Sequence, residues 1–216
     1  MKRAVITGGT GALGTAVAER FVTDGYETWV TAISQADADR FTGNAKVRII
    51  NLTDLNALKG WAQTFDKVDA LVLCAGGFSM QQIIDLVPED LDLQINLNLR
   101  TAIYALDAFG PTFGKGSAAV LVGSQSYNGA AGMAAYAATK AAVVSLAKSS
   151  ALEWKKLGVR VNAILPDTMD TAANRAAMPT ADFEKWAKPS EVASVISFLC
   201  SENAALISGS AINLGR

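Results

Sequence analysis

The sequence TGGTGALG, residues 7–14, decides how the fold of this chain is interpreted. It follows a short apolar run at 4–6 and precedes a segment, 15–24, whose apolar residues recur with helical spacing. Glycines at a strand-to-helix turn let the backbone approach a pyrophosphate, whose charge meets free N–H groups and the positive end of a helix. The spacing GxGxxG therefore predicts a dinucleotide-binding loop, with a tight turn alone as the simpler alternative; it is formed by Gly9, Gly11 and Gly14.

The rest of the chain alternates between two patterns. Short β-branched runs predict strands at 4–6, 28–31, 47–50, 70–74, 119–122, 159–164 and 211–214. Stretches with a 3.6-residue apolar period predict helices at 15–24, 54–65, 89–109, 133–157 and 190–201. This alternation indicates an α/β protein with a doubly wound Rossmann fold, in which helices flank both faces of a mostly parallel seven-stranded sheet.

Length and charge limit the classes of protein that fit. A chain of 216 residues suits one domain, 1–216, within which the irregular segment 166–189 is too long for a routine connection and is a candidate substrate loop or lid. The net charge of −1, without a basic block, predicts no nucleic-acid partner and no membrane-surface partner. No window approaches the length of a transmembrane span, and the first apolar run is too short for a signal peptide.

The cysteine and histidine content limits the kinds of catalysis that the chain can perform. Cys74 and Cys200 lie in apolar runs far apart in sequence, which favours reduced core thiols and a cytoplasmic location. The chain contains no histidine, so Ser-His-Asp hydrolysis, HExxH zinc chemistry and histidine acid or base catalysis are excluded, and no metal site is predicted. Any proton donor is a different side chain, and we expect activity to follow a group that titrates above the histidine range.

The segment YAATK, residues 136–140, supplies a candidate proton donor. A step of four residues places Tyr136 and Lys140 on one face of a helix, one turn apart. An ammonium group beside a phenol stabilises the phenolate and lowers a pKa that is otherwise near 10, so that tyrosine becomes a usable acid. The alternative is an ordinary pair of helical neighbours.

Ordered motifs along almost the whole chain resemble the short-chain dehydrogenase/reductase family. They are TGGTGALG at 7–14, LCAGG at 73–77, INL at 95–97, VGS at 122–124, YAATK at 136–140, VNAILP at 161–166 and the ending SFLCSENAALISGSAINLG. Within the family the chain looks most like members related to dihydropteridine reductase, because of GMAAYAATK and DTMDTAANRAAMP.

The resemblance implies a role for each matching residue. Tyr136 would protonate a carbonyl oxygen or deprotonate an alcohol while a hydride moves to or from nicotinamide. Lys140 would bind the nicotinamide ribose, Asn96 would hold a water that links Lys140 to solvent, and Ser124 would hydrogen-bond the substrate carbonyl. The implied cofactor-binding residues are Gly8, Thr10, Gly11, Ala12, Leu13, Gly14, Ser34, Asn51, Leu52, Ala75, Gly76, Tyr136, Lys140, Pro166 and Thr168.

The chain departs from the family pattern at four places. Ala12 replaces a common glycine, Leu73-Cys74 replaces the usual Asn-Asn, and Asp167 stands where glycine commonly follows the proline. Ser124 lies twelve residues before Tyr136, one fewer than usual, so Ser126 is the alternative partner of the carbonyl.

The expected second strand ends in Val30-Thr31-Ala32-Ile33-Ser34 without an acidic residue. An acid at this place would bind the ribose hydroxyls and repel a 2′-phosphate. Its absence slightly favours NADP(H) over NAD(H), with Ser34 or Arg40 as candidates to meet the phosphate.

The predicted function is an NAD(P)(H)-dependent oxidoreductase that acts on a carbonyl or alcohol substrate. The alternatives are reduction of a C=N bond, as in the pterin-like members, and a non-catalytic dinucleotide-sensing protein of the same fold. Arg175 in the irregular segment is a candidate for an anionic substrate group, and Phe78 and Met80 are candidate pocket walls. The resemblance also implies a homodimer or homotetramer formed through helices 89–109 and 133–157.

Overall fold

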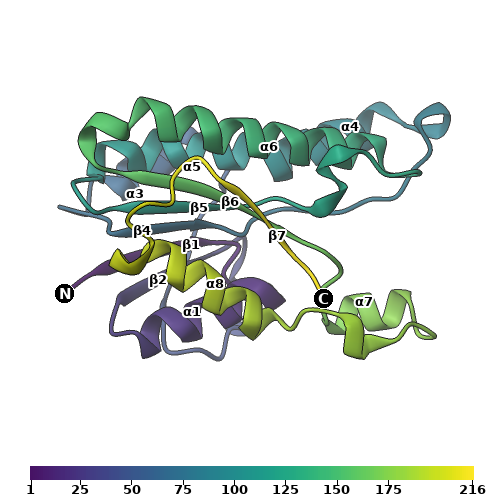
Figure 1. Cartoon of the computed structure of the whole chain (residues 1–216), viewed down its shortest axis with the longest axis horizontal. Helices are drawn as coiled ribbons and strands as arrows, with labels where there is room; N and C mark the ends of the chain where they lie inside the picture. The colour runs from purple at the N-terminus through teal and green to yellow at the C-terminus, as the bar shows by residue number, and fades with distance from the viewer.

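Seven strands form one sheet in the order β3-β2-β1-β4-β5-β6-β7, in a computed structural model that describes residues 1–216 (Figure 1). Every neighbouring pair of strands is parallel. The predicted doubly wound Rossmann fold is therefore confirmed. The strands are β1 (Arg3–Thr7), β2 (Glu27–Ala32), β3 (Lys46–Ile49), β4 (Ala70–Leu73), β5 (Ala118–Val122), β6 (Arg160–Pro166) and β7 (Ala211–Leu214).

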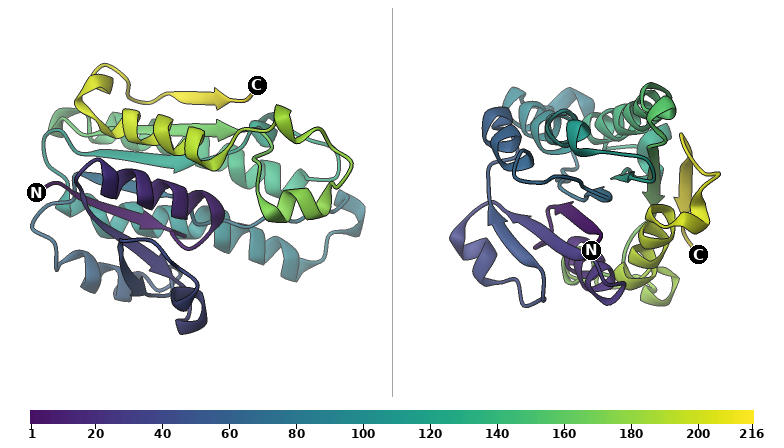
Figure 2. Two further views of the ribbon diagram at one scale, coloured as in Figure 1. Left: turned by 90° about the horizontal axis from the view of Figure 1, so that it is seen from below. Right: turned by 90° about the vertical axis from the view of Figure 1, so that its left-hand side faces the viewer.

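Helices cover both faces of the sheet (Figures 1 and 2). One face carries α1 (Ala12–Thr23) and α8 (Pro189–Cys200), and the other carries α3 (Leu55–Ala62), α5 (Thr101–Phe109) and α6 (Ala134–Glu153). Successive residues of a strand point to opposite faces. Accordingly, Val5 of β1 belongs to the core under α3, α5 and α6, whereas Ile6 belongs to the core under α1 and α8.

The helix predicted at 89–109 is divided into three parts. They are α4 (Pro88–Gln94), a π-helical segment (Ile95–Arg100) and α5. A π-helical segment bonds each residue to the fifth one along and so rotates the following side chains relative to a regular helix. Asn98 is the buried residue of this segment.

Two short helices were not predicted from the sequence. They are α2 (Gln35–Asp39), which follows β2, and α7 (Ala172–Ala177), which lies within the segment predicted to be irregular. Both are too short to show a periodic apolar stripe, and each begins at a hydroxyl N-cap, Ser34 or Thr171.

No helix is long and apolar enough to cross a membrane. Cys74 and Cys200 are free thiols. No group of three or more histidine, cysteine, aspartate or glutamate side chains is arranged to hold a metal ion.

Candidate functional site

The candidate site lies at the edge of the sheet where the parallel strands end. The glycine loop follows β1, Ala75 and Gly76 follow β4, Ser124 follows β5, and Pro166 is the last residue of β6. In open parallel sheets, ligands bind outside the carboxyl ends of the strands, where the chain reverses the strand order. The order in this sheet reverses between β1 and β4, directly beside the glycine loop.

The glycine loop is packed too closely for side chains at three of its glycines, Gly8, Gly9 and Gly14. Gly8 has a φ of +64°, and a Cβ there would lie 2.7 Å from the backbone of Ala75. A Cβ at Gly14 would lie 2.2 Å from the carbonyl oxygen of Gly8. Because α1 begins at Ala12, with Gly11 as its N-cap, its first N–H groups have no acceptor within the helix. The loop therefore fits the pyrophosphate of a dinucleotide.

Tyr136 and Lys140 lie at the start of α6, facing the end of β5. The Lys140 side chain is 5% exposed, and its Nζ donates to the carbonyl oxygen of Val122 at 3.0 Å. The same Nζ lies 5.6 Å from the centre of the Tyr136 ring. Burial lowers the pKa of Lys140 to about 8, and burial raises the pKa of the Tyr136 phenol.

Two serine hydroxyls lie beside this pair. The Oγ atoms of Ser124 and Ser126 are 2.9 Å apart, and the N–H of Ser126 donates to Ser124 Oγ. A hydrogen bond with the Ser124 hydroxyl opposes the upward shift in the pKa of Tyr136. Two hydrogen bonds therefore hold Ser126 against Ser124 at the end of β5.

The structure brings Asn98, rather than Asn96, next to Lys140. A Cβ placed on Gly76 would lie 2.8 Å from Asn98 Oδ1 and 3.4 Å from Lys140 Nζ, so both side chains converge on this glycine. Asn98 is 2% exposed and exchanges hydrogen bonds with the N–H and the carbonyl oxygen of Gly77. Asn96 is half-buried and takes no part in this network.

The two asparagines differ because residues two apart on a helix point to different sides. The spacing of Gln94 and Asn98, four residues and so about one helical turn apart, was the signal that could have placed both on one face. Asn98 Nδ2 donates to Gln94 Oε1 at 2.9 Å, and Gln94 is almost fully buried.

The remaining predicted cofactor residues occupy the same edge of the sheet. Ser34 caps α2, and Thr168 donates its N–H to the side chain of Asp167. The Asn51 side chain accepts hydrogen bonds from Thr53 and so shapes the turn after β3. Leu52 is buried.

Asp37, which the sequence analysis did not single out, also lies at this edge. Its Oδ2 accepts a hydrogen bond from the hydroxyl of Thr10 in the glycine loop, at 2.8 Å. Asp37 lies in α2, beyond the end of β2, so the residues at the end of the strand do not reveal it.

The segment after β6 is ordered by its own side chains. Arg175 forms a two-pronged ion pair with Asp170, at 2.5 and 2.9 Å, and its guanidinium lies 4.5 Å from the ring centre of Phe183. Arg175, the candidate to bind an anionic substrate group, is therefore already paired with Asp170. Asp170 also donates its N–H to Ala187, which joins the two ends of the segment.

Apolar side chains line the other side of the site. The rings of Phe78 and Tyr136 meet edge to face, with their centres 5.0 Å apart. A hollow of about 810 Å³ opens nearby, between Met80 and the residues that precede α6; its lining is Met80, Gln81, Gln82, Ile83, Ala130, Ala131, Gly132 and Ala134.

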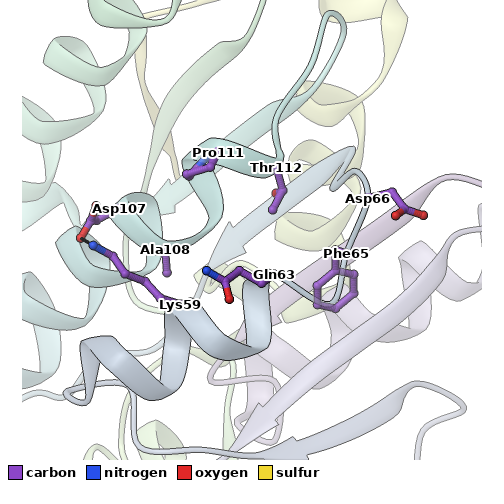
Figure 3. Close-up of a pocket in the computed structure, with 8 residues that line it drawn as sticks. All are labelled: Lys59, Gln63, Phe65, Asp66, Asp107, Ala108, Pro111 and Thr112. Atoms are coloured by element: carbon purple, nitrogen blue, oxygen red, sulfur yellow. Dashed lines mark ion pairs between the residues drawn. The ribbon is translucent and has the colours of Figure 1, made fainter.

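A second hollow, of about 400 Å³, lies between α3 and the end of α5 (Figure 3). Its most ordered polar feature is an ion pair between Lys59 and Asp107 at 2.9 Å. The hollow is next to the segments that lead into β4 and β5, at the amino edge of the sheet. It therefore lies away from the edge where parallel sheets bind ligands.

Comparisons with known proteins agree with this geometry. Residues 9–214 match the family model described as enoyl-(acyl carrier protein) reductase. The chain is 29% identical to the cyclic-di-GMP-binding biofilm dispersal mediator protein of Escherichia coli (strain K12), over 96% of this chain and 93% of that protein. It is 31% identical to the 3-oxoacyl-(acyl-carrier-protein) reductase MabA of Mycobacterium tuberculosis (strain ATCC 25618 / H37Rv), over 96% and 89%.

Solved structures share the fold over nearly the whole chain. The crystal structure of BdcA in complex with NADPH superposes with a TM-score of 0.90 at 28% sequence identity. The match covers 99% of this chain and 92% of that one.

Proposed function

Since the chain belongs to the short-chain dehydrogenase/reductase family and is an NAD(P)-dependent oxidoreductase, we propose that it reduces a carbonyl, or oxidises the corresponding alcohol, with Tyr136 as the acid and base. The observation that carries this proposal is the convergence of Tyr136, Lys140 and Ser124 at the carboxyl end of β5. The nicotinamide, when bound, supplies or accepts the hydride.

The side chains divide the work of moving the proton. In reduction, the Tyr136 hydroxyl donates its proton to the carbonyl oxygen as that oxygen gains negative charge, and Ser124 donates a hydrogen bond to the same oxygen. Lys140 stabilises the phenolate that remains, because a positive charge beside a phenol lowers its pKa. In oxidation the phenolate accepts the proton of the alcohol.

We assign to Asn98 the role that the sequence analysis gave to Asn96. The shared approach of Asn98 and Lys140 to Gly76 supports this assignment. Asn98 Oδ1 keeps a lone pair that can accept from the water that returns a proton to Lys140, whereas Asn96 lies outside the network.

For the cofactor we propose NADP(H) in preference to NAD(H). The absence of an acid between Val30 and Ser34 supports this preference, as does the NADPH bound to the similar BdcA. The segment 166–189 serves as the substrate loop, closing over the nicotinamide site to exclude water. The place of this segment directly after β6, at the carboxyl edge of the sheet, supports this role.

We further propose that the protein forms a homodimer or homotetramer through helices 89–109 and 133–157. Exposed apolar side chains on these helices support this assembly; they are Leu91, Leu93, Ile103 and Leu152. A cytoplasmic location is supported by the two free thiols, Cys74 and Cys200.

A dinucleotide-binding protein without turnover is the second candidate, because one similar protein is named for binding cyclic-di-GMP. Reduction of a C=N bond is the remaining alternative, and it uses the same proton donor. An assay of NADPH and NADH oxidation with carbonyl and imine substrates separates these three candidates.

The decisive variant is Tyr136→Phe, which removes the proton donor and keeps the ring. We expect kcat to fall by about 10²- to 10⁴-fold, with binding of NADP⁺ unchanged. Equal turnover by the variant and the wild type would show that Tyr136 is not the acid, and absence of turnover in the wild type with every substrate would favour the binding protein.

The asparagine assignment is tested by comparing Asn98→Ala with the matched control Asn96→Ala. We expect only Asn98→Ala to lower kcat and to shift the pH profile of kcat, since only Asn98 lies beside Lys140. Loss of activity in Asn96→Ala alone would restore the assignment made from the sequence. Thermal unfolding of both variants identifies any effect that comes from lost stability.

A further inference from the structure

The segment between β6 and α8 has one polar attachment to the rest of the protein. Residues 169–187 form their ion pairs and hydrogen bonds among themselves, with a single exception. In that exception, Arg216 Nη1 donates to the carbonyl oxygen of Glu184 at 3.2 Å. The other support is apolar, since Ala187 is buried and Met169 packs against the core under α1 and α8. The polar attachment of the segment therefore depends on Arg216.

The same guanidinium also binds the start of α8. Arg216 Nη2 donates to Glu191 Oε1, in the first turn of this helix. The other carboxylate oxygen, Oε2, accepts the N–H of Lys188 at 2.8 Å. The Lys188 N–H and the Arg216 guanidinium hold the pKa of Glu191 below its ordinary value, so the carboxylate is ionised at neutral pH. The planar fork of Arg216 thus bridges the turn Phe183–Lys185 and the first turn of α8.

Arg216 itself is placed by the sheet, because it follows β7 directly after Gly215 (Figure 1). The carbonyl oxygen of Leu214, the last residue of β7, accepts the N–H of Asp167 at 2.8 Å and Gln125 Nε2 at 3.1 Å. These bonds fix the end of β7 to the residue after β6 and to the turn after β5. The guanidinium therefore joins the carboxyl edge of the sheet, where the site lies, to the segment that follows β6.

The ion pair is of moderate strength. The side chains of Arg216 and Glu191 are each about half exposed, and an exposed ion pair shifts an equilibrium by up to about fivefold. An attachment of this strength favours one arrangement of the segment without preventing it from opening. Such a balance suits a loop that must close over a substrate and open again to release the product.

We propose that Arg216 is a positioning residue, which holds the segment 166–189 over the site and so raises the fraction of molecules that are ready to bind the carbonyl substrate. This role rests on the proposed function of the segment as the substrate loop. Arg216 acts through Glu184 and Glu191 and not through contact with the substrate. When the attachment is lost, the segment opens more often, and the apparent affinity for the substrate falls with the fraction of closed molecules.

The first test compares the hydrogen exchange of backbone amides in Arg216→Ala and in the matched control Lys185→Ala. Lys185 also forms an exposed ion pair, with Asp182 at 3.3 Å, but that pair lies within the segment and does not attach it to the sheet or to α8. We expect exchange in residues 169–187 to rise by about two- to fivefold in Arg216→Ala and by less than about twofold in Lys185→Ala. Exchange in the strands should stay unchanged in both variants.

The second test measures carbonyl reduction with NADPH. In Arg216→Ala we expect KM for the carbonyl to rise by about two- to fivefold and kcat to change by less than about twofold, because a saturating substrate closes the loop again. Arg216→Lys keeps the charge but not the planar fork, so it should restore part of both effects. Raising the salt concentration to about 0.5 M should increase exchange in the wild type towards that of Arg216→Ala and leave the variant unchanged.

Equal exchange in the wild type and Arg216→Ala, or an equal rise in Lys185→Ala, would overturn the role of Arg216 and leave the proposed reaction intact. Faster exchange without any change in KM would also overturn the positioning role, and the segment would then not be the substrate loop. Absence of turnover in the wild type with every carbonyl would refute the proposed reaction and the positioning role with it. Thermal unfolding confirms that each variant is folded before the rates are compared.

Discussion

At the scale of single residues, Lys140 destabilises the folded protein but is needed for the proposed reaction. Its amine is almost fully buried, and its hydrogen bond runs to a neutral carbonyl oxygen, that of Val122. Burial of a charge without a paired countercharge disfavours the charged form and lowers the pKa, here to about 8 from an ordinary value of 10.5. The charged amine therefore lowers the stability of the folded protein, although the proposed reaction needs that charge.

Replacing this lysine should stabilise the protein. Each unit of pKa shift corresponds to about 1.4 kcal/mol. Below pH 8 the charged amine therefore destabilises the folded state by roughly 3 kcal/mol, and its hydrogen bond offsets part of this cost. Lys140→Met should raise the free energy of unfolding by about 1–3 kcal/mol at pH 7, measured by urea denaturation, while abolishing turnover.

The dependence on pH distinguishes this cause from better packing. Between pH 8 and pH 10.5 the unfolded chain binds more protons at this lysine than the folded chain, so the stability of the wild type rises with pH there. The advantage of Lys140→Met should shrink over the same range. An advantage that stays constant with pH would contradict the explanation. Lys148→Met, at an exposed position of α6, is the control and should change stability by less than about 0.5 kcal/mol.

At the scale of structural elements, the β1–α1 loop shows why its conformation could be predicted from its sequence. Its conformation depends on atoms that are close along the chain, since Gly14 packs on the carbonyl oxygen of Gly8 six residues earlier. Gly8 also packs on the backbone of Ala75 at the end of β4. The loop is thus fixed by local turn geometry together with contacts to β2, to α2 and to the end of β4.

A pair of glycine substitutions tests this close packing. Gly8→Ala forces a Cβ onto a left-handed residue and to within 2.7 Å of Ala75, so we expect a loss of about 2–4 kcal/mol in stability and loss of NADP⁺ binding. Gly60→Ala, in α3 with open space around the added Cβ, should instead stabilise by about 0.5–1 kcal/mol. Chemical denaturation of both proteins would contradict the argument if Gly8→Ala matched the wild type.

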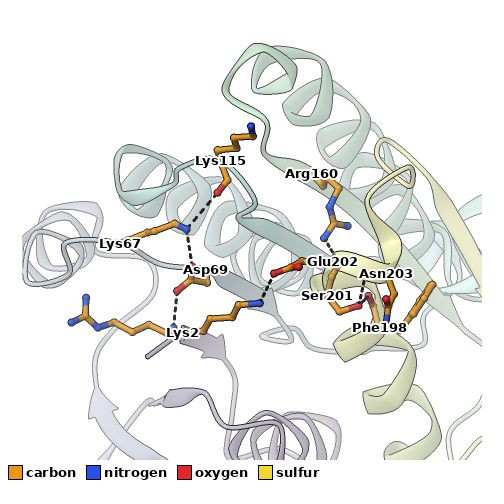
Figure 4. Close-up of polar contacts among 10 residues, drawn as sticks. Lys2, Lys67, Asp69, Lys115, Arg160, Phe198, Ser201, Glu202 and Asn203 are labelled. Atoms are coloured by element: carbon orange, nitrogen blue, oxygen red, sulfur yellow. Dashed lines mark hydrogen bonds and ion pairs between the residues drawn. The ribbon is translucent and has the colours of Figure 1, made fainter.

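At the scale of the whole molecule, the two edges of the sheet have different tasks. The carboxyl edge carries the site, and the amino edge joins distant parts of the chain (Figure 4). There Lys2 forms an exposed ion pair with Glu202, and Lys67 bonds to Asp69 and to the carbonyl oxygen of Lys115. Arg160, at the start of β6, is buried and donates to the carbonyl oxygen of Ser201 at 2.9 Å.

Arg160 should be the residue of this edge that matters most for stability. Besides Ser201, it donates to the carbonyl oxygen of Leu199 at 2.5 Å, at the end of α8. Arg160→Leu removes the donor to the Leu199 oxygen and leaves the Ser201 oxygen with only the Ala204 N–H, and a buried group that loses its partner costs about 1–3 kcal/mol. We expect a loss of about 2–5 kcal/mol in urea denaturation.

The exposed ion pair of Lys2 with Glu202 should matter much less for stability than the buried Arg160. Lys2→Ala should cost no more than about 1 kcal/mol, because both members of its pair with Glu202 are open to solvent. If Lys2→Ala destabilised the protein as much as Arg160→Leu, burial would not be the deciding factor at this edge.

The order of the elements was predictable because it depends on short-range patterns. Each predicted strand matches one in the sheet, and the buried inner strands show why, since a fully buried strand needs a run of apolar residues. The short helices α2 and α7 were missed, because five or six residues cannot show a helical period. The choice between Ser124 and Ser126 stays a prediction, since the two hydroxyls bond to each other and both follow β5.

The sequence by itself determined the α/β order, the glycine loop, and the pairing of Tyr136 with Lys140 on one helix face, because each of these follows from spacing within one segment. Only the tertiary structure decided that Asn98 faces Lys140 and that Asp37 reaches the glycine loop. The first depends on which face of the segment 94–98 is buried, at which the four-residue spacing of Gln94 and Asn98 only hints, and the second on a contact between residues 27 positions apart. Both contacts join segments that are distant in sequence, so only folding brings these groups together.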